Sequence, residues 1–235
     1  MLTSFYTAST GTIQIQKGMD VVANNIANVS TTGFKPSETN FSDLVYTAMQ
    51  GTGQNMKLGH GAKLAKTDVV FSNGGINQTG RNLDFAVFDR TGFFGIITPE
   101  GMKYTKNGNF FLSEGEDGAF YLASELGGFV ADAQGNPIAI NPDTLETQTL
   151  AVGVFTFENL DGLMRDGDSA FLATPNSGNA VAVPDAEVQQ GFLEGSAVDM
   201  AQEMSSVIQL QRAFQLNTRI VQMADEVMQT VNSMR

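Results

Sequence analysis

The chain has 235 residues, contains no cysteine and carries a formal net charge of −12 at pH 7. The lack of cysteine excludes disulfides and thiolate metal sites, and the negative charge argues against nucleic acid or an anionic membrane as the main partner, because both bind basic surfaces. With 42% hydrophobic residues the chain can bury a sizeable core, and its length allows one or two domains.

The charge is concentrated in the middle of the chain. Residues 36–195 contain eight basic and twenty acidic residues, whereas residues 1–35 and 196–235 carry net charges of +1 and −1. Nearly neutral ends can pack closely together, while an acidic middle stays solvated and repels itself. We therefore expect the ends and the middle to form different parts of the protein.

Residues 1–29 are predicted to form a helix, because their apolar side chains recur every seven residues. One line of positions contains Phe5, Met19 and Ile26, and its neighbour contains Ala8, Ile15, Val22 and Val29. A third line consists of the small residues Ser4, Gly11, Gly18 and Asn25. Glycine inside a helix costs about 1 kcal/mol relative to alanine, so this line suggests close approach of another helix. The alternative is a helix that starts at Gly11, with residues 1–10 loosely ordered.

Residues 36–62 are expected to be a linker or junction. Asn28, the run 30–33 and Pro36 end the first helix. Residues 41–46 could form a short helical turn, and the glycine-rich stretch 51–61 reads as irregular. Neither Gly51-Thr-Gly53 nor Gly59-His-Gly61 matches a phosphate-binding loop, because no strand–GxGxxG–helix context surrounds them.

Residues 63–195 are predicted to form an all-β domain. Of 25 glycines, 22 lie between residues 36 and 195, as do all six prolines, and short β-type runs alternate with turns. Asn107-Gly108 and the turn 134–137 are typical of hairpins. The expected strands are Asp68–Phe71, Leu83–Phe88, Phe93–Thr98, Lys103–Thr105, Phe110–Leu112, Ala119–Ala123, Phe129–Ala131, Ile138–Ile140, Leu150–Phe157, Ala170–Ala173 and Ala180–Val183.

Residues 196–235 are predicted to form one long helix, since they contain neither glycine nor proline. Gly195-Ser196 supplies the start signal, with Asp199 three residues later in a capping-box arrangement. Glu203 and Asn217 interrupt an otherwise apolar seam. Its members seven apart are Met200, Val207, Phe214, Val221 and Met228, with Leu210, Ala224 and Val231 at the intervening positions.

A second apolar stripe is predicted on the same helix, roughly opposite the seam. It contains Leu216, Ile220, Met223, Val227 and Met234. A helix that is apolar on two sides is expected to be covered on two sides, and a single partner helix covers only one of them. A core helix within a larger domain would satisfy the same pattern, and the sequence leaves that alternative open.

The simplest arrangement is an α+β fold. The terminal helices, residues 1–35 and 196–235, pack as an antiparallel coiled-coil pair that flanks the inserted β domain. Copies of the chain can then satisfy the remaining apolar lines by stacking in an open, head-to-tail symmetry that makes filaments. The residues expected to make these inter-subunit contacts are Phe5, Ile15, Met19, Val22, Ile26, Met200, Val207, Leu210, Phe214, Val221 and Met228.

The sequence does not support an enzyme. His60 is the sole histidine and lies between two glycines without an identifiable nucleophile. Asp161, Asp166 and Asp168 do not have the spacing of an EF-hand and are better explained as acidic turns. The methionines of the C-terminal helix are packing residues rather than a cofactor site. We expect no cofactor and no metal.

No cleavable secretory signal is expected, because the first basic residue is Lys17 and no apolar run of about seven residues precedes a small-residue cleavage site. No run approaches the roughly 18 apolar residues that span a bilayer, so no direct membrane insertion is expected.

Several segments together resemble the bacterial flagellar rod and hook proteins. The segments that carry the resemblance are residues 19–35 (MDVVANNIANVSTTGFK), 193–204 (LEGSAVDMAQEM), 211–217 (QRAFQLN), 82–87 (NLDFAV) with 92–94 (GFF), and 104–110 (YTKNGNF). They cover both ends and about half of the middle, in the order found in that family. Paired terminal motifs of this kind are highly specific.

The resemblance implies a structural, axial protein of the flagellar basal body. Its terminal helices are expected to line the core of a tube, with the β domain outward. Its expected partners are further copies of itself, other rod and hook axial proteins and the flagellar type III export apparatus, which would carry it to the cell envelope without a cleaved signal. Either a Gram-negative or a Gram-positive source fits.

The resemblance also assigns roles to particular residues. Those expected to shape the junction between helix and β domain are Asn24, Asn25, Asn28, Gly33 and Phe34, and those expected on the inter-subunit helical surface are Gln211, Arg212 and Asn217. Within the family the two ends look most like the distal rod protein, while residues 83–87 fit the proximal rod protein about as well. A wall- or glycan-binding module with dimerising helices is a weaker alternative, since the chain has no tryptophan for an aromatic platform.

Overall fold

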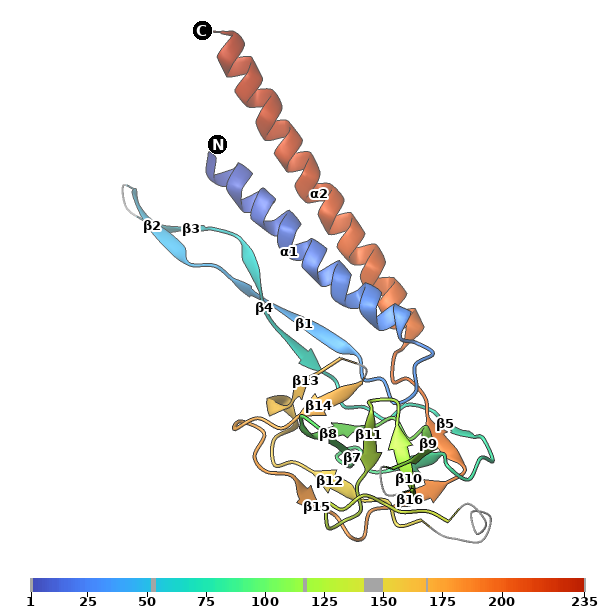
Figure 1. Ribbon diagram of the computed structural model, residues 1–235. Helices are drawn as coiled ribbons and strands as arrows, with labels where there is room; N and C mark the ends of the chain where they lie inside the picture. The colour runs from blue at the N-terminus through green and yellow to red at the C-terminus, as the bar shows by residue number, and fades with distance from the viewer. Residues whose placement is uncertain (1, 52–53, 116–117, 142–149, 168, 235) are drawn as a thin grey trace. The chain divides into compact units, whose positions relative to one another are not determined.

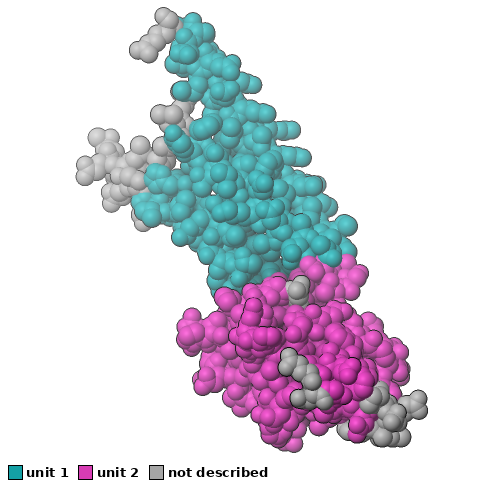
Figure 2. Space-filling model, in the orientation of Figure 1, with its two compact units in different colours: residues 1–27, 37–69, 199–235 teal, residues 28–36, 70–198 magenta. Residues whose placement is uncertain are grey.

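A computed structural model of the protein describes residues 2–51, 54–115, 118–141, 150–167 and 169–234. The chain forms two compact units, each built from segments that are distant in the sequence (Figure 2). Unit 1 comprises residues 1–27, 37–69 and 199–235, and unit 2 comprises residues 28–36 and 70–198. The predicted α+β class is confirmed, with one long helix at each end of a β-rich region.

Unit 1 contains the two long helices. Helix α1 (Leu2–Ala27) and helix α2 (Met200–Ser233) lie side by side and run in opposite directions (Figure 1). Because α1 begins at Leu2, the alternative start at Gly11 is wrong. Helix α2 begins four residues later than Ser196, since Asp199 is its N-cap and accepts hydrogen bonds from the backbone N–H groups of Ala201 and Gln202.

Two antiparallel strand pairs complete unit 1. Strand β1 (Ser37–Asp43) pairs with β4 (Ala62–Val69), and β2 (Tyr46–Gly51) pairs with β3 (Gln54–Gly59). The β1–β4 ribbon runs along α1 (Figure 1), where the Gln14 side chain accepts a hydrogen bond from Leu64 N at 3.1 Å.

The expectation for residues 36–62 was therefore wrong in its secondary structure. Residues 41–46 form no helical turn, since residues 41–43 end β1 and residue 46 begins β2. Residues 54–59 form a strand rather than an irregular stretch, and residues 52–53 lie outside the described part of the chain. A short apolar run is ambiguous by itself, and pairing with residues about 25 positions away decides its conformation. The unit boundaries accordingly differ from the predicted ones, since residues 37–69 belong with the helices and residues 28–36 with the β-rich unit.

Unit 2 is built on one sheet with the strand order β13-β14-β8-β7-β11-β10-β9, in which β12 also pairs with β7 and β15 pairs with β12. Two further antiparallel pairs, β16–β6 and β17–β5, belong to the same unit. The strands are β5 (Ile76–Gln78), β6 (Phe85–Val87), β7 (Phe93–Thr98), β8 (Gly101–Thr105), β9 (Phe110–Glu114), β10 (Phe120–Ser124), β11 (Gly128–Val130), β12 (Val154–Thr156), β13 (Met164–Arg165), β14 (Ala170–Leu172), β15 (Val181–Ala182), β16 (Val188–Gln190) and β17 (Phe192–Glu194).

Most of the predicted β runs are strands, and β7 has the predicted bounds. Residues 138–140 are an exception, because Ala139 makes an isolated bridge with Tyr121 and no strand forms there, while Ile140 contributes to the core. The turn at 134–137 is present, closed by a hydrogen bond from Asp132 N to Asn136 O at 2.8 Å. Asn107-Gly108 is not a hairpin, because β8 pairs with β7 and β14 whereas β9 pairs with β10. Gly108 instead packs against the backbone of Phe85, where a Cβ atom would clash.

The core of unit 2 is aromatic and closed. The Phe94 ring packs edge-on against Phe110 with centroids 5.3 Å apart, and the Phe85 ring lies tilted to Phe110 with centroids 6.0 Å apart. The fully buried aliphatic residues around them are Ile96, Leu122 and Val130.

Candidate interaction surface

The two helices of unit 1 meet along the line of small residues predicted on α1. A Cβ atom added at Gly11 would lie 2.9 Å from Nδ2 of Asn217, and one added at Gly18 would lie 3.7 Å from Leu210. Asn25 Nδ2 donates a hydrogen bond to Glu203 Oε1 at 2.8 Å. The contacts are spaced by seven residues on both helices, so the pair keeps one register over two heptads.

The two polar residues that interrupt the α2 seam thus have partners within the chain. Asn217 lies against Gly11, and Glu203 binds Asn25, which is buried. The Asn25 amide also donates to Ser37 O at 2.8 Å and accepts from Ser37 N at 2.9 Å. One side chain therefore ties the end of α1 both to α2 and to the start of β1.

The second apolar stripe of α2 is uncovered. Its side chains are 39–76% exposed, and no described residue of α2 is buried. The helix is therefore not a core helix within this chain. At about 100° per residue, the centre of the stripe lies about 120° round the helix from the side that meets α1, rather than opposite it. Several large apolar side chains exposed along one side of a helix are typical of an interaction site. The stripe consists of Leu216, Ile220, Met223, Val227 and Met234.

The predicted contact residues fall into three groups. Val22 is buried; Ile15, Met19, Ile26, Met200, Val207, Leu210, Phe214 and Val221 are half-buried; Phe5 and Met228 are exposed. Among the residues assigned by resemblance, Gln211 and Arg212 are exposed and Asn217 faces Gly11. The assignment of these residues to contacts between copies stays a prediction.

The junction residues divide between the two units. Asn24 is exposed and Asn25 buried on α1, whereas Asn28, Gly33 and Phe34 belong to unit 2. Gly33 has φ +67°, and a Cβ atom there would lie 2.5 Å from the carbonyl carbon of Lys106. Glycine is required at this position by both conformation and space.

A buried ion pair, which sequence reasoning missed, closes unit 2 beside the junction. Lys35 Nζ lies 2.7 Å from Glu194 Oε1, and both side chains are 1% exposed. Lys35 also donates to Ser72 O at 2.5 Å, and Gly74 N donates to Glu194 Oε1 at 2.9 Å. Burial lowers the pKa of Lys35, while the Glu194 charge opposes that shift.

Backbone hydrogen bonds continue this closure. Gly33 N donates to Glu194 O at 2.8 Å, and Ala197 N donates to Phe34 O at 3.0 Å. The guanidinium of Arg165 stacks over Phe34, 4.9 Å from the ring centroid, and donates to Lys35 O. The two points at which the chain enters and leaves unit 2 are thereby held together. No local pattern could have indicated a pair of residues 159 positions apart.

The acidic residues considered above make ordinary surface interactions. Asp166 pairs with Lys103 at 2.7 Å, and Asp161 N bonds the Asn159 side chain in a short 3-10 helix, Leu160–Gly162. Asp168 lies outside the described residues. Within the described ranges, no cluster of three or more His, Asp or Glu side chains could hold a metal ion. None of the described helices has the length and apolarity to cross a membrane.

Comparison with known proteins decides the family. The model described as "Flagellar basal body rod FlgEFG protein C-terminal" matches residues 189–234, and "Flagella basal body rod protein" matches residues 5–35. The chain is 31% identical to flagellar basal-body rod protein FlgG of Bacillus subtilis over the whole of both chains. The chain belongs to the flagellar basal-body rod family.

Other relatives agree with this membership. Rod protein FlgG of Agrobacterium fabrum is 31% identical over 96% of each chain, and rod protein FlgF of Mesorhizobium japonicum is 29% identical over 99% of each. The chain is a structural subunit of the flagellar basal-body rod, as its resemblance indicated. The family models cover α1 with the junction, and β17 with α2, which are the segments that build the surfaces described above.

Proposed function

We propose that this rod subunit assembles through unit 1 into a helical tube that transmits torque to the hook and filament. The observation that carries the proposal is the uncovered apolar stripe on α2, which lies on a helix already paired along another side. Burying such side chains contributes about 25 cal/mol per Å² of apolar surface. Coiled-coil packing between helices of neighbouring copies would cover the stripe.

The distribution of charge also favours assembly through unit 1 rather than unit 2. Unit 1 has seven basic and eight acidic residues, a net charge of −1, whereas unit 2 has six basic and seventeen acidic residues, a net charge of −11. Copies can approach through unit 1 with little repulsion, but approach through unit 2 is opposed by charge. Unit 1 is therefore the surface that suits self-association.

The finer placement rests on the terminal motifs. We assign the chain a distal-rod-like position, with other rod and hook axial proteins as neighbours and the flagellar type III apparatus as its route of export. A proximal position is the alternative, because relatives with the names FlgG and FlgF both match over nearly the whole chain. The role is mechanical, and no catalytic step is assigned to it.

The test introduces one charge in or beside the stripe. Leu216→Asp places a carboxylate on the exposed apolar surface, whereas Gln215→Asp places the same charge on the adjacent, exposed position outside the stripe. We expect Leu216→Asp to abolish incorporation into isolated basal bodies and swimming motility, because its burial at a contact would cost several kcal/mol.

The control Gln215→Asp is expected to assemble and to support motility. Circular dichroism of both monomers should give the same melting curve, since both positions are exposed in the single chain. Normal incorporation of Leu216→Asp would show that the stripe is not an assembly surface.

A further inference from the structure

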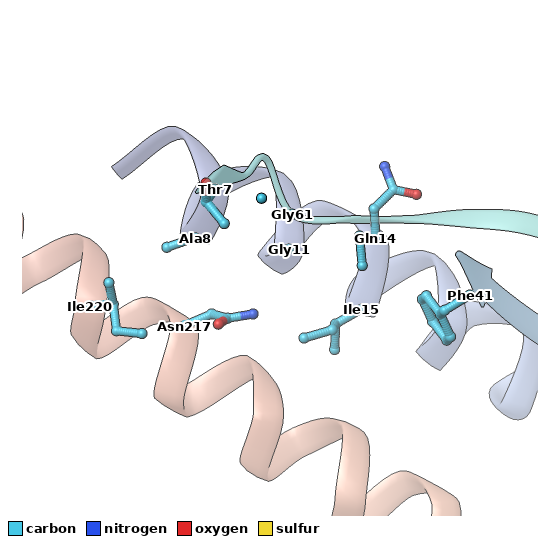
Figure 3. Close-up of a pocket in the computed structure, with 11 residues that line it drawn as sticks. Thr7, Ala8, Gly11, Gln14, Ile15, Phe41, Gly61, Asn217 and Ile220 are labelled. Carbon is cyan, nitrogen blue, oxygen red and sulfur yellow. The ribbon is translucent and has the colours of Figure 1, made fainter. Parts of the chain in front are cut away.

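Unit 1 contains an unfilled apolar pocket between α1, α2 and the β ribbon. Its volume is about 480 Å³, within the roughly 300–1,000 Å³ range of ligand-sized sites. Ala8 and Ile15 line it from α1, Asn217 and Ile220 from α2, and Phe41 from β1 (Figure 3). None of the described residues that line it has a charged side chain.

Glycines create this space. Gly11, Gly59 and Gly61 belong to the lining and contribute no side chain to fill it. Gly61 has φ +107°, and a Cβ atom there would already touch the Thr7 side chain at 3.4 Å. The Asn217 carboxamide projects towards the space from the α2 side (Figure 3) and offers a hydrogen-bonding group to an occupant.

A second feature of unit 1 matches the pocket in chemistry. The register set by Gly11 and Asn217 places Leu2 level with Glu226, so α2 continues for about 12 Å beyond the first described turn of α1 (Figure 1). We call residues 227–234 the C-terminal extension. Its sequence, VMQTVNSM, is uncharged, and Met228, Val231 and Met234 are 49%, 49% and 76% exposed.

We propose that the pocket of one copy receives apolar side chains from the C-terminal extension of a second copy. The proposal rests on the proposed function and names the surfaces through which assembly occurs. Both surfaces are apolar and uncharged, so their contact removes water without burying an unpaired charge. Ile220 belongs both to the pocket wall and to the exposed stripe, so the two form one continuous apolar surface.

The extension cannot occupy the pocket of its own chain. Val231 is fourteen residues from Asn217 on an unbroken helix, a separation of about 21 Å. The donor is therefore another molecule. Pocket and extension occupy different places on one chain, and we take each copy to engage one neighbour through its pocket and another through its extension. This heterologous contact repeats from copy to copy and builds an open helical assembly, whereas a reciprocal exchange between two copies would close a dimer.

Because the chain contains no cysteine, disulfide trapping tests this contact directly. Full-length Thr7→Cys carries a thiol at the pocket, and full-length Val231→Cys carries one on the extension. The two variants, distinguished by mass tags, are mixed and oxidised under polymerising conditions. A disulfide requires Cα atoms within about 4.4–6.8 Å, so we expect a mixed disulfide between the two chains.

The matched control replaces Thr7→Cys by Gln16→Cys, which is exposed on α1 and does not line the pocket. We expect at least a tenfold lower yield of mixed disulfide from that pair. Sedimentable polymers without a mixed disulfide at Thr7 would overturn this inference and leave the proposed function standing. Absence of sedimentable polymer from the unsubstituted chain, under all conditions tried, would overturn the proposed function itself.

Removal of residues 228–235 is a second, independent test. We expect the shortened chain to lose sedimentable polymer and to keep the melting curve of the monomer, since Met228, Val231 and Met234 are exposed in the single chain. Ala62→Leu, which narrows the pocket from β4, should raise the concentration needed for polymerisation at least tenfold. Unchanged polymerisation by both variants would also overturn the inference.

Discussion

The two units of this rod subunit differ in how completely they bury their apolar surface. In unit 2, Phe94, Ile96 and Leu122 are fully buried within a closed aromatic core. In unit 1, the described part of α2 has no buried residue and five members of one stripe are exposed. Unit 2 buries its core within a single chain, whereas unit 1 leaves this stripe exposed in the single chain. Under the function proposed above, unit 2 supplies stability and unit 1 supplies the assembly surface.

The largest effect is expected at the buried ion pair of unit 2. Glu194→Gln leaves the Lys35 ammonium buried without its counter-charge, and removal of one partner from a buried pair costs about 3–5 kcal/mol. The measurement is the free energy of unfolding of unit 2 in urea. Glu100→Gln is the matched control, because Glu100 is 80% exposed in its pair with Lys103 and should cost about 0–1 kcal/mol. Equal losses in the free energy of unfolding for the two variants would show that burial of the Lys35–Glu194 pair does not make it more important than an exposed pair.

A smaller effect is expected at the junction glycine. Gly33→Ala combines a left-handed backbone conformation with a clash against the Lys106 backbone, and overpacking alone typically costs about 1–3 kcal/mol. Gly80→Ala is the matched control, since its φ is +70° and, among the described residues beyond its two chain neighbours, no heavy atom lies within 4 Å of the new Cβ; it should lose about 1–2 kcal/mol. The difference between the two variants, measured by urea unfolding, isolates the clash. No difference would contradict the close approach at Gly33.

The smallest of the three is expected in unit 1. Asn25→Ala removes the amide that joins α1 to Glu203 and Ser37, and an unmade buried hydrogen bond costs about 1–3 kcal/mol. Hydrogen exchange should show faster opening of the amides of α1 and β1 with little change in unit 2. The exposed Gln16→Ala should change neither unit by more than about 0.5 kcal/mol. Equal loosening of both units by Asn25→Ala would mean that they unfold as one, which would break the comparison.

Several parts of this organisation could be predicted from residue patterns. The seven-residue repeats predicted both helices, and the line of Gly11, Gly18 and Asn25 indicated where α2 packs. The run Phe93–Thr98 has the observed bounds of β7, because a short apolar segment between turn residues suits a buried strand. The terminal motifs indicated the family, which the comparisons confirm.

Other parts could not be predicted, because they depend on residues that meet only after folding. Residues 41–46 have no decisive period, and β1 becomes a strand by pairing with β4. The helix α2 was predicted to start at Ser196 but starts at Met200. Both Ser196 and Asp199 are good N-cap residues, and the sequence does not show which of them is used. Lys35 and Glu194 carry no sign in the sequence of their mutual burial.

The sequence alone determined the two amphipathic helices, the acidic β-rich middle and membership of the rod family, because period, charge and motif are local properties of the chain. The tertiary structure decided which apolar stripe is covered and which is left exposed. That choice depends on how α1, α2 and the β1–β4 ribbon pack together. The sequence shows that the stripe from Leu216 to Met234 is apolar, but it does not show whether the rest of the chain covers it. In the folded chain the stripe is exposed.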